Sequence, residues 1–121
     1  MISGIGNRGR ATLPVTFRLP AQPNVTIEFV IDTGFTEYLT LPQAAVSAMK
    51  LPFLYSERAG LADGSDVLLD VYGVTISWHG QERKVRVIAT GRRPLLGTAL
   101  MDDQELRVQF RENGLVSIEE L

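Results

Sequence analysis

The segment Phe29–Gly34 carries the residues of this sequence that are best placed to do chemistry. The apolar run Phe29-Val30-Ile31 leads directly into Asp32-Thr33-Gly34, so a carboxyl group is expected where a strand ends and the chain turns. A carboxylate held in such a position can act as a general base and take a proton from water. The same tripeptide also suits an ordinary strand-ending turn, because Asp and Gly are favoured there. On its own it leaves both interpretations open.

A second motif favours the chemical interpretation. Leu95-Leu96-Gly97 lies about sixty residues downstream, where an apolar pair is followed by glycine and a short helical segment. We expect that segment to begin near Thr98 and to cover Ala99–Gln104, which is long enough for only a turn or two. The two motifs together indicate a chemical role for Asp32 more specifically than the tripeptide does alone.

The elements that must position these motifs are predicted to be mainly strands, because apolar and polar residues alternate along much of the chain. Pro14 cannot donate a backbone hydrogen bond, so its strand should have a free edge there or turn that position toward solvent. A change of apolar phase across Gly73 predicts a bulge or bend, and Asn113-Gly114 predicts a two-residue hairpin turn. The expected strands cover residues 12–19, 25–31, 67–78, 84–89, 106–110 and 115–118.

One further helix of about two turns is expected after Thr40. Thr40-Leu41-Pro42-Gln43 has capping-box spacing with proline in the first turn, and Leu51-Pro52 ends the helical pattern. About seven short strands in 121 residues then predict a single domain over residues 1–121. Its fold class is mostly β, a closed β-barrel with one or two short helices.

The composition excludes several classes of function. The chain is 45% hydrophobic and 21% charged, as in soluble globular proteins, and its net charge of -2 offers no excess positive field for nucleic acid or a membrane surface. The longest apolar stretches are only a few residues and Met1–Arg10 has no apolar signal core, so we expect a cytoplasmic protein that does not span a membrane. With no cysteine there is no disulfide or thiolate nucleophile, and we expect no metal and no cofactor.

Other motifs have ordinary structural interpretations. Gly4–Gly9 spells G-x-G-x-x-G, but no apolar strand precedes it and a strand, not a helix, is expected after it, so a dinucleotide site is not predicted. His79, the only histidine, stands beside a glycine and is expected in a turn. Arg92-Arg93 is expected in a solvated loop rather than in an anion site. No serine lies in the context of a nucleophile elbow.

Val30–Gly34 together with Leu95–Gly97 resembles the motifs of the retropepsin-like (retroviral-type) aspartic proteases, in particular their small prokaryotic relatives. The resemblance extends from about Thr12 to Ile118, with strands, motifs and terminal strand in the same order. It implies an acid-protease β-barrel that hydrolyses peptide bonds. It also implies that Asp32 is the catalytic carboxylate, that Thr33 bonds across a two-fold axis and that Gly34 lets the substrate backbone approach.

The resemblance assigns roles to two further segments. Leu95, Leu96 and Gly97 would pack against the catalytic loop and support it. The stretch Leu61–Ser65, with Ala62, Asp63 and Gly64, would be the tip of a flap that closes over the substrate. Phe35 and Asp63 depart from the viral pattern, which has small residues and glycines at these places. Phe35, Tyr38, Leu61 and Leu95 are candidate walls of the side-chain pockets.

Amide hydrolysis by carboxylates needs one ionised group to take a proton from water and one protonated group to polarise the carbonyl. The chain contains a single Asp-Thr-Gly, and no other aspartate follows an apolar strand and precedes glycine in this way. The second carboxylate must then be Asp32 of another copy, so we expect a homodimer acting on a peptide or protein substrate. By analogy with the family, the apolar strand Leu115–Ile118 is a candidate for the rest of the interface.

Two alternatives remain from the sequence. A non-catalytic relative would keep the barrel as a peptide-binding or dimerisation module, and would bind an extended strand through main-chain hydrogen bonds. A small β-barrel in which Asp32-Thr33-Gly34 is only a turn could instead be monomeric.

Overall fold

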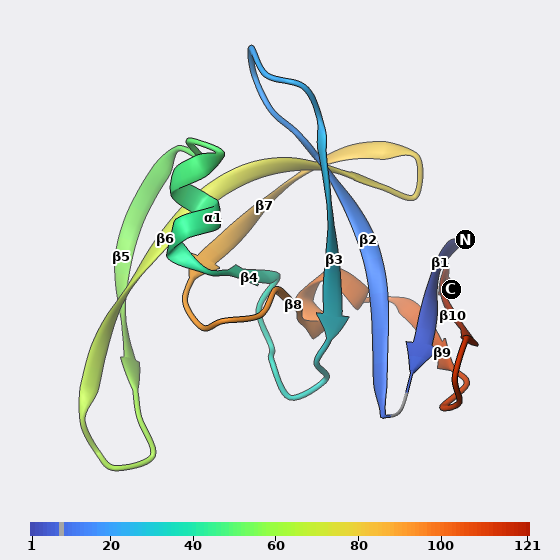
Figure 1. Ribbon diagram of the computed structural model, residues 1–121. Coiled ribbons are helices and arrows are strands. Elements are labelled where there is room, and N and C mark those ends of the chain that lie inside the picture. The colour runs from blue at the N-terminus through green and yellow to red at the C-terminus, as the bar shows by residue number, and fades with distance from the viewer. Residues whose placement is uncertain (8) are drawn as a thin grey trace.

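The computed structural model of the protein describes residues 1–7 and 9–121 (Figure 1). Two short helical segments, α1 (Gln43–Ala48) and the 3-10 helix η1 (Thr98–Met101), lie among strands. The strands are β1 (Ile2–Asn7), β2 (Arg10–Arg18), β3 (Val25–Ile31), β4 (Leu39–Leu41), β5 (Phe53–Gly60), β6 (Asp66–Trp78), β7 (Gln81–Ala89), β8 (Leu95–Leu96), β9 (Gln104–Val108) and β10 (Gly114–Glu120).

The strands form one sheet that closes on itself. Its order is β5-β6-β7-β4-β8-β3-β2-β1-β10-β9, and an additional pairing of β6 with β2 joins two strands that are separated in this order. Thr16, Phe17 and Arg18 pair there with Ser77, Ile76 and Thr75, so that β6, β7, β4, β8, β3 and β2 make a ring. The prediction of a mostly β chain closed into a barrel with short helices is confirmed.

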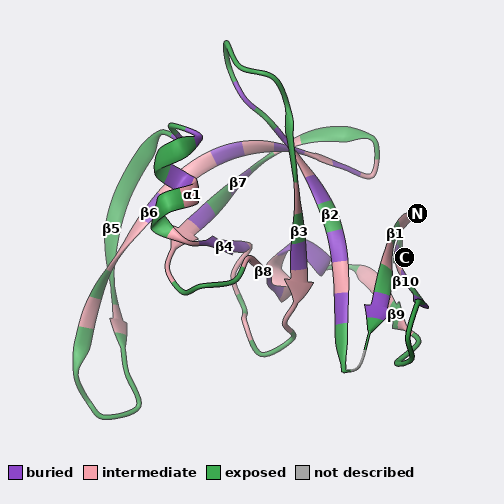
Figure 2. Ribbon diagram, in the orientation of Figure 1, coloured by how far each residue is buried: buried purple, intermediate pink, exposed green. Residues whose placement is uncertain are grey.

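The core fills the inside of this ring. Phe17 and Phe29 are fully buried and stack with their ring centroids 5.9 Å apart. Val46 of α1 is buried against the same cluster. Figure 2 shows the buried positions along β2, β4, β6 and β7, whereas β5 is exposed along nearly all of its length. Further fully buried side chains are Leu13, Val15, Leu39, Leu41, Ile76, Val87, Leu96, Leu100 and Ile118.

The expectation for Pro14 is confirmed. On one side β2 pairs with β3 from Thr12 to Phe17. On its other side it pairs with β1 as far as Thr12 and with β6 from Thr16 onward. Between these two partners no described strand lies against this edge, and the exposed Pro14 stands in the gap. Pro14 therefore lies where this edge of β2 has no partner strand among the described residues, a position in which proline is tolerated.

Thr40 does not cap a helix as predicted. It lies within β4, where Leu39, Thr40 and Leu41 are all buried because β4 is paired on both sides, with β7 and with β8. Helix α1 begins only after Pro42 and has no side-chain cap. The second helical segment starts at Thr98 as expected but is shorter than predicted. No helix in residues 1–7 and 9–121 is long and apolar enough to cross a membrane.

The bulge expected at Gly73 is on the neighbouring strand. Pairing of β6 with β7 runs without interruption through Gly73, but the register of β5 shifts between Phe53 and Tyr55. Leu54 is the extra residue, and its side chain lies over Gly73, 3.4 Å from where a Cβ would stand. The absence of a side chain on Gly73 makes room for Leu54.

Asn113-Gly114 does not form the predicted two-residue turn. β9 ends at Val108 and β10 begins at Gly114, so residues 109–113 form the connection and Phe110 is 68% exposed outside the strand. Asn113 has a positive φ of 57°, but Gly114 does not. A Cβ on Gly114 would collide with the carbonyl oxygen of Gln109, which explains the glycine by close approach rather than by turn type.

The glycine-rich start of the chain forms strand β1, which the sequence analysis did not predict. Gly4 and Gly6 interrupt the apolar alternation, and a Cβ on either would collide with a backbone carbonyl oxygen, of Thr12 and Gln109 respectively. The first residues of the G-x-G-x-x-G motif therefore belong to a sheet and not to a phosphate-binding loop. Its fifth residue, Arg8, lies outside the described residues.

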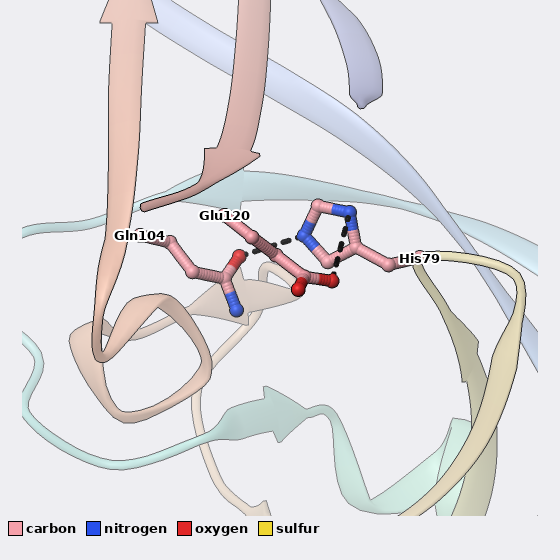
Figure 3. A network of polar contacts seen from close by, with 3 residues as sticks. All are labelled: His79, Gln104 and Glu120. Atoms are coloured by element: carbon pink, nitrogen blue, oxygen red, sulfur yellow. Dashed lines mark hydrogen bonds and ion pairs between the residues drawn. The ribbon is translucent and has the colours of Figure 1, made fainter.

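His79 lies in the β6–β7 turn, as predicted, with Gly80. Both residues have positive φ, 51° and 76°. The ring nitrogen Nε2 lies 2.8 Å from Oε1 of Gln104, and Nδ1 lies 3.9 Å from a carboxylate oxygen of Glu120 (Figure 3). The histidine thus links this turn to the first residue of β9 and the end of β10, and its role here is structural.

The stacked pair of phenylalanines generates a prediction about stability. Replacing Phe29 with alanine leaves a cavity beside Phe17, so we expect Phe29→Ala to lower the free energy of unfolding by about 3–5 kcal/mol. Leu115→Ala is the control, because Leu115 is 69% exposed and should change this value by at most about 0.5 kcal/mol. Urea unfolding followed by circular dichroism measures both. Equal losses in the two variants would contradict the assignment of Phe29 to the core.

Candidate active site

Asp32 is the first residue after β3, and its half-buried side chain is oriented by its own loop. The backbone N–H of Gly34 donates a hydrogen bond of 2.9 Å to Oδ1 of Asp32. The N–H of Phe35 donates to the carbonyl oxygen of Asp32 over 3.1 Å and closes the turn. A Cβ on Gly34 would stand 3.3 Å from Oδ1, so any larger residue would crowd the carboxylate. Thr33 and Gly34 are exposed beside it.

Strand β8 lies beside β3 and holds the start of this loop through backbone hydrogen bonds. It pairs in parallel with β3, with Leu95 opposite Val30 and Leu96 opposite Ile31. The N–H of Val30 donates to the carbonyl of Pro94, and the N–H of Asp32 donates to the carbonyl of Leu96, both over 2.9 Å. On its other side β8 pairs antiparallel with β4. The chain therefore leaves β3, makes the Asp32 turn and returns as β4 on the far side of β8.

Gly97 packs tightly against the segment that follows the Asp32 turn. Its N–H donates to the carbonyl of Tyr38 over 2.8 Å, and the N–H of Thr98 donates to the carbonyl of Phe35 over 2.9 Å. A Cβ on Gly97 would stand 2.6 Å from the ring of Phe35 and 2.7 Å from its carbonyl oxygen, and would collide with the carbonyl of Glu37. Only glycine fits there without moving the backbone of the Asp32 loop.

Thr40 supports the same arrangement, although the sequence analysis assigned it to a helix cap. Its buried hydroxyl accepts a hydrogen bond of 3.1 Å from the N–H of Leu95 and donates to the carbonyl of Arg93 over 3.4 Å. It thereby holds the segment that enters β8. The leucines on both sides of Thr40, followed by a proline, were the signal for a short buried strand.

The predicted flap is the hairpin of β5 and β6. Its turn is closed by the N–H of Gly64, which donates to the carbonyl of Leu61 over 3.0 Å, and by the N–H of Leu61, which donates to the carbonyl of Ser65 over 2.8 Å. Gly64 has a φ of 86°, as a three-residue hairpin loop requires. In Figure 1 this turn and the connection after β3 project from the same side of the molecule, the lower side of the view.

Asp63 shapes the tip of this hairpin. Its Oδ1 accepts hydrogen bonds from the backbone N–H of Ser65 over 2.9 Å and from the Ser65 hydroxyl over 2.6 Å. Both bonds favour the ionised form, the hydroxyl most, and hold the pKa of Asp63 below its ordinary value of 3.8. The turn is therefore built around a charged carboxylate.

Three solved structures share this arrangement of strands. A retropepsin-like aspartic protease from Rickettsia conorii aligns with 98% of this chain and 89% of its own, with a TM-score of 0.64 at 17% identity. The protease of Simian Foamy Virus (mac) aligns over 75% of this chain and 91% of its own, with a TM-score of 0.55 at 18% identity. The chain has the retropepsin-like fold.

A third solved structure, EIAV protease in complex with the inhibitor HBY-793, covers 78% of this chain and 86% of its own, with a TM-score of 0.54 at 22% identity. No protein-family model and no curated protein matches the sequence. The likeness therefore concerns the fold, and it assigns no role to individual residues.

In this retropepsin-like chain a cavity of about 230 Å³ opens beside the Asp32 loop. Glu37 and Tyr38 from the loop, Tyr55 and Glu57 from β5, and Arg86 from β7 line it with Val71 and Ile88. The carboxylate of Glu37 lies 3.6 Å from Nη2 of Arg86. Of the four residues expected to form pocket walls, only Tyr38 lines this cavity; Phe35 instead packs against Gly97.

Strand β10, a candidate for the dimer interface, has both of its edges occupied. Ile2–Gly6 of β1 pair with one edge, and Gln104–Val108 of β9 pair with the other. A partner strand cannot add to β10 without displacing one of them. Another molecule could contact β10 only through one face of the strand, on which Leu115 is 69% exposed.

The close approach at Gly97 predicts a large effect of one methyl group. We expect Gly97→Ala to lower the free energy of unfolding by about 2–4 kcal/mol, because the backbone of the Asp32 loop has to move. Gly60→Ala is the matched control, since its Cβ would meet no atom closer than 3.9 Å. Thermal unfolding measures both. A Gly97→Ala protein as stable as the Gly60→Ala protein would contradict the contact.

The flap turn predicts a dependence on pH. Because the folded pKa of Asp63 is lowered, its contribution to the turn is complete above the ordinary value of 3.8 and is lost as the pH falls through the lower folded pKa. We expect the NMR-detected pKa of Asp63 to lie below 3.8, and Ser65→Ala to raise it toward that value. An unchanged pKa in Ser65→Ala would show that the hydrogen bond from the Ser65 hydroxyl does not cause the shift.

Proposed function

We propose that this protein is an aspartic endopeptidase that acts as a homodimer on peptide or protein substrates, with Asp32 of each chain in one shared site. The observation that carries the proposal is the half-buried Asp32 carboxylate, oriented by the Gly34 N–H and anchored through Leu96. The likeness of the fold to retropepsin-like aspartic proteases supports the same reaction class. Thr33 and Gly34 remain exposed for a partner chain and a substrate.

The chemistry follows from two carboxyl groups that share one proton. The ionised Asp32 takes a proton from a water molecule as its oxygen attacks the peptide carbonyl carbon, and the protonated Asp32 gives its proton to the carbonyl oxygen. The tetrahedral intermediate collapses when the Asp32 that took the proton from water gives it to the amide nitrogen, which leaves as an amine, and one hydroxyl of the intermediate returns a proton to the other Asp32. One peptide bond and one water are consumed, and one carboxyl and one amine are formed. No covalent bond to the enzyme is made.

The β5–β6 hairpin supplies the flap in this proposal. Its strand β5 is exposed, and Leu61 and Leu68 near the tip are 51% and 66% exposed. Apolar side chains on a projecting hairpin favour contact with a bound peptide. Ala62, Asp63 and Gly64 form the turn that would lie over the substrate, and Leu95, Leu96 and Gly97 support the catalytic loop.

The central test is cleavage of a mixed peptide library at acidic to neutral pH. We expect the native chain to cleave and Asp32→Asn to lose at least about a thousandfold in kcat/KM, because the amide cannot take the proton from water. Asp102→Asn is the control, an exposed aspartate outside the loop. If the native chain binds peptides without cleaving them and Asp32→Asn binds equally well, the protein is a peptide-binding module and the catalytic proposal is wrong.

Mixing native and Asp32→Asn chains tests whether the site is shared. When the two are unfolded together in equal amounts and refolded, random pairing leaves about a quarter of the dimers with two native chains. A site built from two Asp32 residues then gives about half the expected activity per native chain. Activity that stays proportional to the amount of native chain would show that one Asp32 suffices.

A further inference from the structure

A second and larger hollow lies between the β2–β3 turn, the end of α1 and strands β5, β6 and β7, and it shares Tyr38 and Arg86 with the cavity beside the Asp32 loop. It has a volume of about 880 Å³, within the range of sites that hold ligands. Its lining begins at residues 18–22, at the start of the connection to β3, whereas Asp32 follows the other end of that strand. The seven residues of β3 span about 20 Å at 3.3 Å per residue. Figure 1 shows the two ends on opposite sides of the molecule.

The floor of this hollow, which we call the basic groove, is apolar. Leu19, Met49, Leu51, Val74 and Val85 contribute side chains whose exposure is below a tenth. Leu54, on the β5 bulge, stands at the side of the groove and remains 49% exposed. An occupant that covers Leu54 and this floor would remove apolar surface from water.

The charged side chains that line the basic groove, among the residues that the structure describes, are all positive. Arg18, Lys50, Lys84 and Arg86 line it, and no aspartate or glutamate does, although the whole chain has 14 acidic and only 12 basic residues. The groove therefore attracts anions in a protein whose net charge is -2.

Two of these four cations have weak partners and two have none among the described residues. Arg18 lies 3.6 Å from Glu82, and Arg86 lies 3.6 Å from Glu37, with all four side chains at least 44% exposed. Exposed pairs of this kind contribute little and can exchange partners. Lys50 and Lys84 make no ion pair within residues 1–7 and 9–121, so their charges are available to a bound molecule.

We propose that the basic groove binds an acidic, amphipathic peptide segment of another protein. The four cations come from β2, the end of α1 and β7, so they are spread around the opening. That distribution matches several carboxylates spaced along a chain better than the single head group of a small amphiphile. Apolar side chains of the same segment fit the floor and Leu54. The proposal does not depend on catalysis by Asp32.

The test is fluorescence anisotropy with a labelled peptide of alternating glutamate and leucine residues. The full chain carrying Asp32→Asn is used, so that cleavage cannot remove the probe. We expect saturable binding that weakens about tenfold in Lys50→Gln/Lys84→Gln and about threefold in Leu54→Ser. Arg107→Gln/Arg111→Gln is the charge-matched control and Phe110→Ser the apolar one; these three residues are exposed outside the groove, and both variants should leave the affinity unchanged.

Several results would overturn the proposal. Equal weakening by Arg107→Gln/Arg111→Gln would mean that the peptide binds by general charge attraction. A peptide with serine in place of leucine that binds as tightly would mean that the apolar floor is not used. Binding of dodecanoate but not of the peptide would identify a small amphiphile as the occupant. Self-association that Lys50→Gln/Lys84→Gln abolishes in sedimentation would mean that a second copy covers the groove.

Discussion

The backbone hydrogen bond from Asp32 to Leu96 is the interaction on which the candidate site depends. It ends the parallel pairing of β3 with β8 and fixes the point where the chain turns away from the sheet. A turn residue bonded only within its own loop would be free to move with that loop. Here the position of the carboxylate is fixed by two strands, β3 and β8, whose inner side chains Phe29 and Leu96 are fully buried. A site built on strands of the barrel is held more rigidly than one built on a loop alone.

The two sides of the candidate site differ in how firmly they are held. On the side of the Asp32 loop that contacts Gly97, Gly97 and Phe35 are so close that no additional atom fits between the loop and the residues after β8. The β5–β6 hairpin, in contrast, projects into solvent, and its tip is held mainly by bonds within the turn itself, including those of Asp63. Segments with few buried contacts open at low free-energy cost. In the proposed enzyme, the fixed loop would hold the catalytic group while the exposed hairpin would move to cover a bound peptide.

Much of this arrangement could be predicted from the sequence because it depends on local patterns. The alternation before Asp32 located β3, whereas the apolar pair before Gly97 was recognised as a motif but not as the strand β8. The errors have a common cause: Thr40, Gly73 and Gly114 have local signals that tertiary contacts override. Thr40 looks like a helix cap but is buried between two strands, and Gly114 looks like a turn residue but is required by the carbonyl of Gln109. The basic groove could not be predicted at all, because its cations are brought together from separate elements.

Strand β8 reaches its place between β3 and β4 from far along the chain, since Leu96 lies more than sixty positions after Asp32. Contacts between segments this distant close a long loop, and the entropy of that closure slows the step that forms them. A nascent polypeptide that has emerged only as far as β7 has both β3 and β4 but nothing to insert between them. The hydrogen bond from Asp32 to Leu96 is thus absent from any such fragment, and the turn after β3 is anchored only when synthesis has passed Leu96.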